Sequence, residues 1–314
     1  MSFAQSDPRL ALPAIEAPEP ERLAPHAVYD LADEGSVHVE PGKRTWYGCG
    51  KTFVISYSEV EVGATIEREN EIDEHLVVLH DAGEVDIVAN GEAVNAKGRV
   101  LIILPPGKSR LTFKTAGRVV CVSTARSAPD LMALCNADPA MLNDPNVPEY
   151  EPAGAPFDGY KIRVYDFDSE PMPGAYAAVW RCSSFLVLRG SWKKGQRDTS
   201  MMSPHSHVNF QQSNLVLEGE YRANLRWPWV RNKAEWRKDE QIDIKAPGLL
   251  ITPAQTTHTI EHRADDFNHC VDFYAPPRPD FAALGWALND AEYPRPPMQR
   301  VEKAADGVDT VVPA

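Results

Sequence analysis

Short apolar runs separated by turn residues recur along this chain, and the pattern favours β-strands over helices. Runs rich in Val, Ile, Leu and Phe that are bounded by Gly, Pro and Asn are typical of strands. In the first half they predict strands at residues 51–57, 76–79, 84–88, 100–104, 110–113 and 119–123. Turn residues such as Asn90 and Gly91 separate these runs, as in a barrel or sandwich.

A second series of such runs follows in the other half of the chain. It predicts strands at residues 160–165, 184–188, 220–226, 248–252, 258–262 and 270–274. The two series repeat at a spacing of roughly 140 residues, which indicates an internal duplication. The fold class predicted from the pattern is therefore all-β, with two similar units, each a barrel or a sandwich, in one chain.

The same pattern divides the chain into five predicted segments. They are an extended Pro- and Glu-rich N-terminal arm (1–40) that packs on a partner domain or subunit, a first barrel (41–126), a linker with a short helix (127–165), a second barrel (166–277) and a C-terminal tail (278–314).

Candidate chemistry is concentrated in the second half. His205 and His207 are two residues apart, and on a strand this spacing places both imidazoles on one face. Gln212 follows five residues later and Gly219 stands at a predicted turn. His258 follows an apolar run and a turn that begins at Pro253, so a third imidazole can join the first two.

These residues resemble the two signature motifs of the cupin superfamily, whose small barrels hold a metal ion. The first motif reads glycine, five residues, H-x-H, three or four residues, Glu, six residues and Gly; Gln212 stands at the Glu position and Thr199 at the opening glycine. The second reads P-x-G, two residues, His, three residues and Asn; Gln255 replaces its glycine and His262 its asparagine.

The resemblance implies two cupin-type double-stranded β-helix (jelly-roll) barrels and one divalent metal ion per chain. It implies His205, His207 and His258 as metal ligands, with Gln212 as a fourth ligand or a group beside the ligands. Three imidazoles and a neutral amide leave the ion its full charge, which makes it a stronger Lewis acid than a site with a carboxylate.

The first half resembles a cupin repeat that has lost its site. Glu69 and Glu71 stand at the H-x-H positions, and Arg110 stands where the ligand histidine of the second motif would be. Arginine stays protonated and cannot bind a metal. We expect a structural barrel here, and the alternative is a weak second site on Glu71, Glu74 and His75.

Two further residues are candidates for catalysis. His262 lies four residues after His258, so it shares its strand face and is either a proton shuttle beside the metal or a buried structural histidine. Arg222, in the strand after the metal motif, would suit a carboxylated or aromatic substrate at the barrel mouth.

Composition and charge limit the partners. The 314 residues carry a net charge of -13, which argues against nucleic acid and anionic membranes as partners. The N-terminus shows no signal-like apolar segment and the five cysteines form no C-x-x-C pair, so we expect a cytoplasmic protein without disulfides. We also expect a homo-oligomer that acts on a small anionic or aromatic molecule.

The resemblance favours one function, with Fe(II) as the metal, and leaves two alternatives open. The first is an Fe(II) dioxygenase that cleaves a small aromatic, dicarbonyl or carboxylate substrate, with neutral ligands that leave positions for substrate and O2. The second is a non-redox isomerase, lyase or cyclase that uses Zn, Ni or Mn and moves a proton through His262. The third is a small-molecule binding protein without catalysis.

Overall fold

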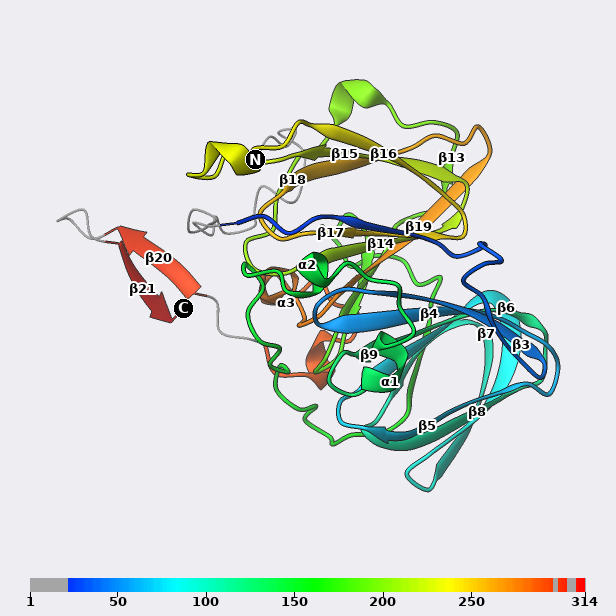
Figure 1. Cartoon of the computed structure of the whole chain (residues 1–314). Helices are drawn as coiled ribbons and strands as arrows, with labels where there is room; N and C mark the ends of the chain where they lie inside the picture. The colour runs from blue at the N-terminus through cyan, green and yellow to red at the C-terminus, as the bar shows by residue number, and fades with distance from the viewer. Residues whose placement is uncertain (1–21, 296–298, 304–308, 314) are drawn as a thin grey trace.

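The structure is a computed structural model that describes residues 22–295, 299–303 and 309–313. Its regular elements are almost all β-strands, and they form two barrels that lie one above the other in Figure 1. Residues 1–21 of the predicted N-terminal arm lie outside the described residues. Within the described part of the chain, no helix is long and apolar enough to cross a membrane.

The first barrel is built on a nine-stranded antiparallel sheet. Its strands are β2 (His38–Glu40), β3 (Lys43–Cys49), β4 (Phe53–Val60), β5 (Thr65–Glu71), β6 (His75–Ala89), β7 (Glu92–Leu104), β8 (Gly107–Phe113), β9 (Gly117–Thr124) and β10 (Arg163–Asp166). The order is β10-β7-β6-β9-β4-β3-β2, and β5 pairs with β8, which also pairs with β6. Asn90 and Gly91 join β6 to β7 with φ values of 50° and 84°, the positive angles that a tight hairpin turn requires.

The second barrel has a seven-stranded and a three-stranded sheet. The larger contains β1 (Ala27–Asp30), β11 (Ala178–Arg181), β12 (Leu186–Arg189), β13 (Lys193–Lys194), β14 (Gln212–Glu218), β17 (Gly248–Thr252) and β19 (Phe267–Tyr274). The smaller contains β15 (Glu220–Arg226), β16 (Glu240–Lys245) and β18 (Thr257–His262). Gly219 joins the two sheets with a φ of 79°, and a Cβ there would lie 2.5 Å from Asn268 Oδ1, so no other residue fits.

The remaining described elements are short. They are the helices α1 (Pro129–Met132), α2 (Pro139–Leu142) and α3 (Pro279–Ala283), 3-10 turns at Thr199–Met201, Lys233–Glu235 and Asp290–Glu292, and a hairpin of β20 (Gln299–Lys303) and β21 (Asp309–Pro313).

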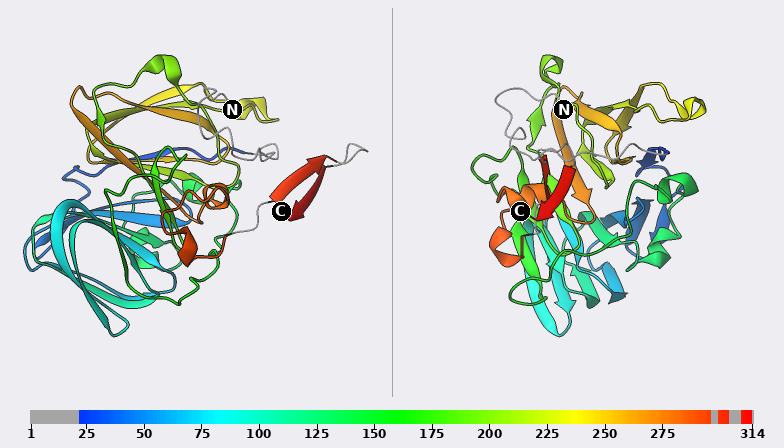
Figure 2. Two further views of the ribbon diagram at one scale, coloured as in Figure 1. Left: turned by 180° about the vertical axis from the view of Figure 1, so that it is seen from behind. Right: turned by 90° about the vertical axis from the view of Figure 1, so that its left-hand side faces the viewer.

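The two barrels exchange strands. β1, from the part of the chain that precedes the first barrel, pairs antiparallel with β17 of the second barrel (Figures 1 and 2). β10 pairs with β7 of the first barrel. The strand predicted at residues 160–165, which the pattern groups with the second series, therefore pairs with the first barrel instead. Apolar periodicity identifies a strand there, but the pairing partner depends on contacts that the local sequence does not contain.

The main hydrophobic core lies between the barrels and not inside either one. Phe53, Ile55 and Tyr57 of β4 contribute to it from the first barrel, and Leu215 and Leu217 of β14 from the second. All five side chains are at most 2% exposed. Burying this much apolar surface fixes the two barrels against each other.

Candidate metal centre

The H-x-H pair and the third histidine are brought together by backbone pairing. His205 and His258 exchange both backbone hydrogen bonds, with N···O distances of 3.0 and 2.7 Å, as an isolated bridge. The predicted strand for the H-x-H pair is wrong in its extent: β14 begins only at Gln212. Gln255 N donates to His207 O at 2.6 Å, and Gln255 has a φ of 62°, which explains why glycine is usual at its motif position.

The three imidazoles form a compact group. Ligand atoms of His205, His207 and His258 all lie within 4.8 Å of one another. The side chains of His207 and His258 are buried and that of His205 is half-buried. Burial lowers the pKa of His258 to about 4 and that of His207 well below its usual value, so both rings are neutral near pH 7. Neutral imidazoles are the form that binds metals.

Backbone carbonyls orient two of the rings. His205 Nδ1 lies 3.0 Å from the carbonyl oxygen of Ser203, and His258 Nδ1 lies 2.9 Å from that of Thr256. A carbonyl only accepts hydrogen bonds, so each Nδ1 carries the proton and donates it. Each Nε2 is then left with a lone pair, as in metal-bound histidines.

Gln212 completes the group and provides the test of whether a cation fits. Its Oε1 lies 2.5 Å from His207 Nε2 and 3.0 Å from His258 Nε2. Since His258 carries its proton on Nδ1, its Nε2 lone pair faces the amide oxygen lone pair at 3.0 Å. Two acceptors at that separation repel each other unless a positive charge lies between them. The donor set therefore fits a divalent cation.

Asp272 sets the direction of the Gln212 amide, and neither sequence motif includes it. Gln212 Nε2 donates to Asp272 Oδ2 at 3.0 Å, and Asn214 Nδ2 donates to Asp272 Oδ1 at 2.7 Å. The amide nitrogen is thus held toward the carboxylate and the oxygen toward the histidines. Burial raises the pKa of Asp272 to about 7. The available signal was a single acidic residue within the apolar run of β19.

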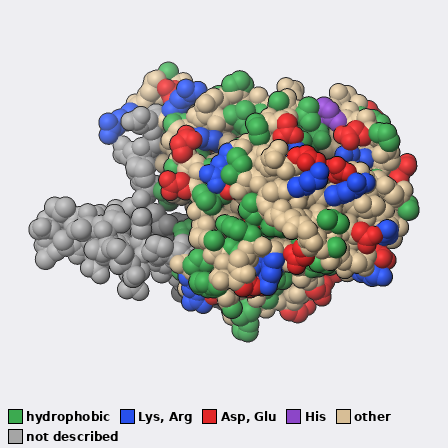
Figure 3. Space-filling model, turned by 90° about the horizontal axis from the view of Figure 1, so that it is seen from below, with side chains coloured by type: hydrophobic (Ala, Val, Ile, Leu, Met, Phe, Trp, Pro, Cys, Tyr) green, Lys and Arg blue, Asp and Glu red, His purple; other side chains and the backbone are tan. Residues whose placement is uncertain are grey.

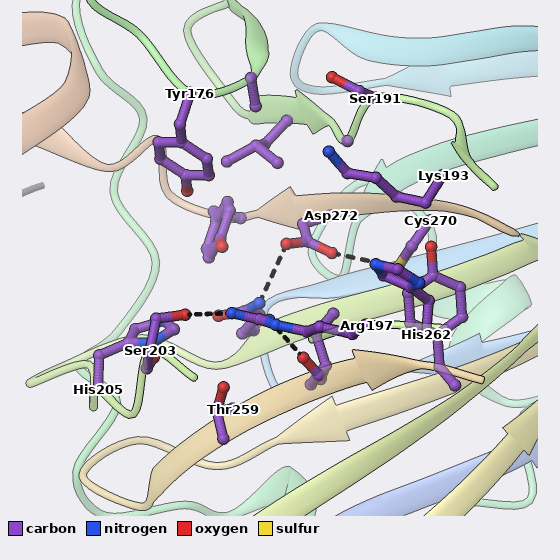
Figure 4. Close-up of a pocket in the computed structure, with 17 residues that line it drawn as sticks. Tyr176, Ser191, Lys193, Arg197, Ser203, His205, Thr259, His262, Cys270 and Asp272 are labelled. Carbon is purple, nitrogen blue, oxygen red and sulfur yellow. Dashed lines mark hydrogen bonds between the residues drawn. The ribbon is translucent and has the colours of Figure 1, made fainter. Parts of the chain in front are cut away.

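A cavity of about 380 Å³ adjoins this group (Figure 4). His205, Gln212 and Asp272 belong to its lining, so a small molecule in the cavity would reach the metal position. Lys193 and Arg197 also line it. Arg197 donates to the carbonyl oxygen of Ile260 at 2.6 Å and to that of Met201 at 3.1 Å, so its guanidinium is held in place.

The two predicted catalytic residues have different positions. His262 lines the cavity, and its Nδ1 donates to the carbonyl oxygen of Gly195 at 2.8 Å, which leaves Nε2 as an acceptor. Burial lowers its pKa, so the ring is neutral near pH 7. Arg222 does not line the cavity. Side chains alternate along β15, so the inward neighbours Tyr221 and Ala223 leave Arg222 on the outer face, where it binds Asp243 at 2.7 and 2.8 Å.

The corresponding residues of the first barrel do not form a metal group. Among the described residues, only the three histidines of the second barrel form such a cluster. Glu71 Oε1 accepts from Arg68 at 2.6 Å and from Ser123 at 3.1 Å. His75 Nε2 contacts Ser109 Oγ at 3.0 Å, and Glu74 Oε2 accepts from the backbone and side chain of Ser183. These side chains have structural partners within the chain.

Solved structures of two-barrel proteins match this chain over most of its length, although no family model and no curated protein sequence matches it. One is the structure of an oxalate decarboxylase from Lactobacillus farciminis in complex with formate. It is 12% identical to this chain, the match covers 82% of this chain and 90% of that one, and the TM-score is 0.53. An oxalate decarboxylase from Bacillus subtilis is 11% identical over 86% and 79%, with a TM-score of 0.51. The chain has the bicupin fold.

AerE from Microcystis aeruginosa, a cupin-fold protein, also matches. It is 8% identical over 81% of this chain and 99% of its own, with a TM-score of 0.50. At these identities the likeness concerns the fold. The all-β class and the two cupin barrels predicted from the sequence are confirmed by these matches.

Proposed function

We propose that this bicupin is a metal-dependent enzyme that moves a proton on a small anionic substrate, as a lyase or isomerase does. Its ion would be held by His205, His207 and His258, with the Gln212 amide oxygen beside them. The observation that carries the proposal is the lone pair of His258 Nε2 facing the Gln212 oxygen at 3.0 Å. A cation between these two atoms makes that contact favourable.

The cavity lining supports an anionic substrate. Lys193 and Arg197 approach it from the β13 strand and the loop that follows, as Figure 4 shows. Cationic side chains around a recess attract and orient carboxylates. Two of the matching structures are named as oxalate decarboxylases, and oxalate is a small dicarboxylate. A volume of about 380 Å³ suits a molecule of that size or somewhat larger.

The proton transfer would pass through His262. A divalent ion at the histidine cluster would polarise a carbonyl or carboxylate oxygen of the substrate. His262 is neutral and its Nε2 is an acceptor, so it would take a proton from the bound substrate as general base. The Gly195 carbonyl would then stabilise the imidazolium through Nδ1–H. Zn, Ni or Mn would serve such a non-redox reaction.

An Fe(II) dioxygenase is the second candidate. The observation that favours it is the neutral donor set, since none of the four side chains at the cluster is a carboxylate. Such a donor set leaves coordination positions open on the metal ion. It also leaves the positive charge of the ion available to bind an anionic substrate and O2. The same residues serve both reactions, so the metal and the use of oxygen distinguish them.

The experiment begins with anaerobic purification and elemental analysis. A panel of small mono- and dicarboxylates is then tested with the metal-loaded protein in a stirred oxygen-electrode cell, with product detection by NMR. We expect turnover without oxygen uptake. His262→Asn, whose amide can still donate to Gly195, should keep its metal and lose at least a hundredfold in kcat. Oxygen uptake coupled to turnover with iron would establish the dioxygenase and refute the proton-transfer proposal.

A further inference from the structure

The interior of the first barrel has an unusual distribution of polar side chains. Side chains of β4 alternate, so that Phe53, Ile55 and Tyr57 pack in the core between the barrels. Ser56 and Ser58 therefore face the inside of their own barrel. An apolar cluster that includes Val85, Ile87, Leu111 and Phe113 fills only part of that interior.

The rest of the interior is a cavity of about 500 Å³, larger than the one beside the histidine cluster. Four neighbouring strands, β6, β9, β4 and β3, supply its polar wall. The wall consists of Thr45, Ser56, Ser58, His75, Cys121 and Ser123. Exposed residues such as Glu40, Glu67 and Leu134 also line the cavity, so it opens to the surface. Such a volume is in the range of small-molecule sites.

The hydroxyl groups of this wall are buried but can still bond a ligand. Thr45 and Ser58 are 3% and 1% exposed, and their oxygens lie 2.9 Å apart in one hydrogen bond. That bond uses one of the two O–H donors, so the other donor and several lone pairs remain. Burying hydroxyls in a barrel interior costs free energy unless they find partners. A polar wall on four adjacent strands therefore indicates a polar occupant.

The charged residues around the cavity are already paired. Lys43 Nζ lies 2.9 Å from Glu40, and Arg68 binds Asp130 through two contacts of 2.7 and 3.0 Å. Glu67, the remaining charged lining residue, lies 3.2 Å from Arg110, which is outside the cavity. Figure 3 shows the molecule from below the view of Figure 1, with acidic and basic side chains intermixed on the visible surface.

This pairing decides the charge of the occupant. Because each cation has an anion beside it, the cavity offers little net charge to an ionic ligand. A neutral molecule with many hydroxyl groups matches the wall instead, since hydroxyls both donate to and accept from Ser and Thr. The half-buried ring of Tyr47 adds an apolar surface against which C–H groups of such a molecule can pack.

We propose that the first barrel binds a neutral polyhydroxylated molecule of monosaccharide or cyclitol size, without a metal, in the cavity walled by Thr45, Ser56, Ser58 and Ser123. The barrel that lacks metal ligands is then a second binding domain. Its ligand differs in charge from the anionic substrate proposed for the other barrel, and its site is independent of the histidine cluster.

The test uses the full-length protein and calorimetric titration with D-glucose, D-mannose, D-galactose and myo-inositol. D-Glucuronate and glucose 6-phosphate serve as anionic counterparts of the same size. We expect at least one neutral probe to bind once per chain, and at least tenfold more tightly than either anion. No binding by any neutral probe, or tighter binding of the anions, would overturn the proposal.

Variants locate the site. Thr45→Val/Ser58→Ala removes both partners of one buried hydrogen bond, so it leaves no unpaired group and should weaken binding at least tenfold. Ser56→Ala is a smaller change and should weaken binding of the neutral ligand severalfold. It takes the place of Thr45→Val/Ser58→Ala if circular dichroism shows that the double variant is unfolded. Thr115→Val, at an exposed turn of the same barrel, and His258→Ala should leave binding unchanged. Loss of binding in His258→Ala would place the ligand in the other barrel and refute the proposal.

Discussion

The substitution Gln212→Glu tests the arrangement around the histidine cluster most directly. In the structure the Gln212 amide presents its oxygen to His207 and His258 and donates from its nitrogen to Asp272 at 3.0 Å. A glutamate at position 212 has an oxygen at both ends and no proton to donate. Two carboxylate oxygens would then lie about 3.0 Å apart in a buried environment.

The size of the effect follows from that distance. Two unit charges 3.0 Å apart repel by roughly 5 kcal/mol at an effective dielectric constant of about 20, which corresponds to roughly four pKa units. Burial alone already raises the pKa of Asp272 to about 7. The pair in the variant should therefore keep one shared proton well above pH 7, while both carboxyls ionise when the chain unfolds.

The sign of the pH dependence differs between the two proteins. A group whose pKa is raised by folding binds more protons in the folded state, so stability falls as the pH rises through that range. In the wild type, the contribution of Asp272 to the free energy of unfolding falls as the pH rises to about 7 and is constant above that pH. In Gln212→Glu, the contribution of the carboxyl pair to the free energy of unfolding should continue to fall, by about 2 kcal/mol between pH 7.5 and pH 9.

The assay is urea unfolding of the metal-free protein at those two pH values. Gln241→Glu is the matched control, because Gln241 is exposed and bonded to Asn224 on the outer face of the same barrel. Zinc should displace the shared proton and stabilise Gln212→Glu at least as much as the wild type. Equal pH slopes for wild type and variant would mean that Gln212 and Asp272 do not face each other, and would refute the reasoning.

Two further predictions concern His258 and His75. His258→Ala should lose its metal, as measured by elemental analysis. It should keep its far-UV circular dichroism, because the core between the barrels contains no residue of the histidine cluster. Full metal content in this variant would contradict the assignment. His75 is buried, which lowers its pKa to about 3, so below pH 6.5 the unfolded chain takes up a proton that the folded chain does not. Between pH 6.5 and pH 5, the free energy of unfolding should fall by about 2 kcal/mol more in the wild type than in His75→Gln, as measured by urea unfolding. Equal losses in the two proteins would show that His75 becomes charged in the folded protein.

The sequence by itself determined the fold class and the members of the histidine cluster. Alternating apolar residues and turn residues are local signals, and they predict strands without knowledge of the partners. Each motif is also local, since His205, His207 and Gln212 lie in one short segment and His258 closely follows Pro253 in another. For this reason the members of the histidine cluster could be predicted before the strands were paired.

Only the tertiary structure decided which residues surround that cluster. Asp272 meets Gln212 because β19 pairs with β14, and no local pattern relates positions 60 residues apart. Arg222 faces outward because strand faces alternate, so an uncertainty of one residue in register reverses a side chain. The cavity of the first barrel arises in the same way, because Thr45 and Ser58 become neighbours only when β3 pairs with β4. Their hydroxyls face inward because the apolar side of β4 is buried against the second barrel.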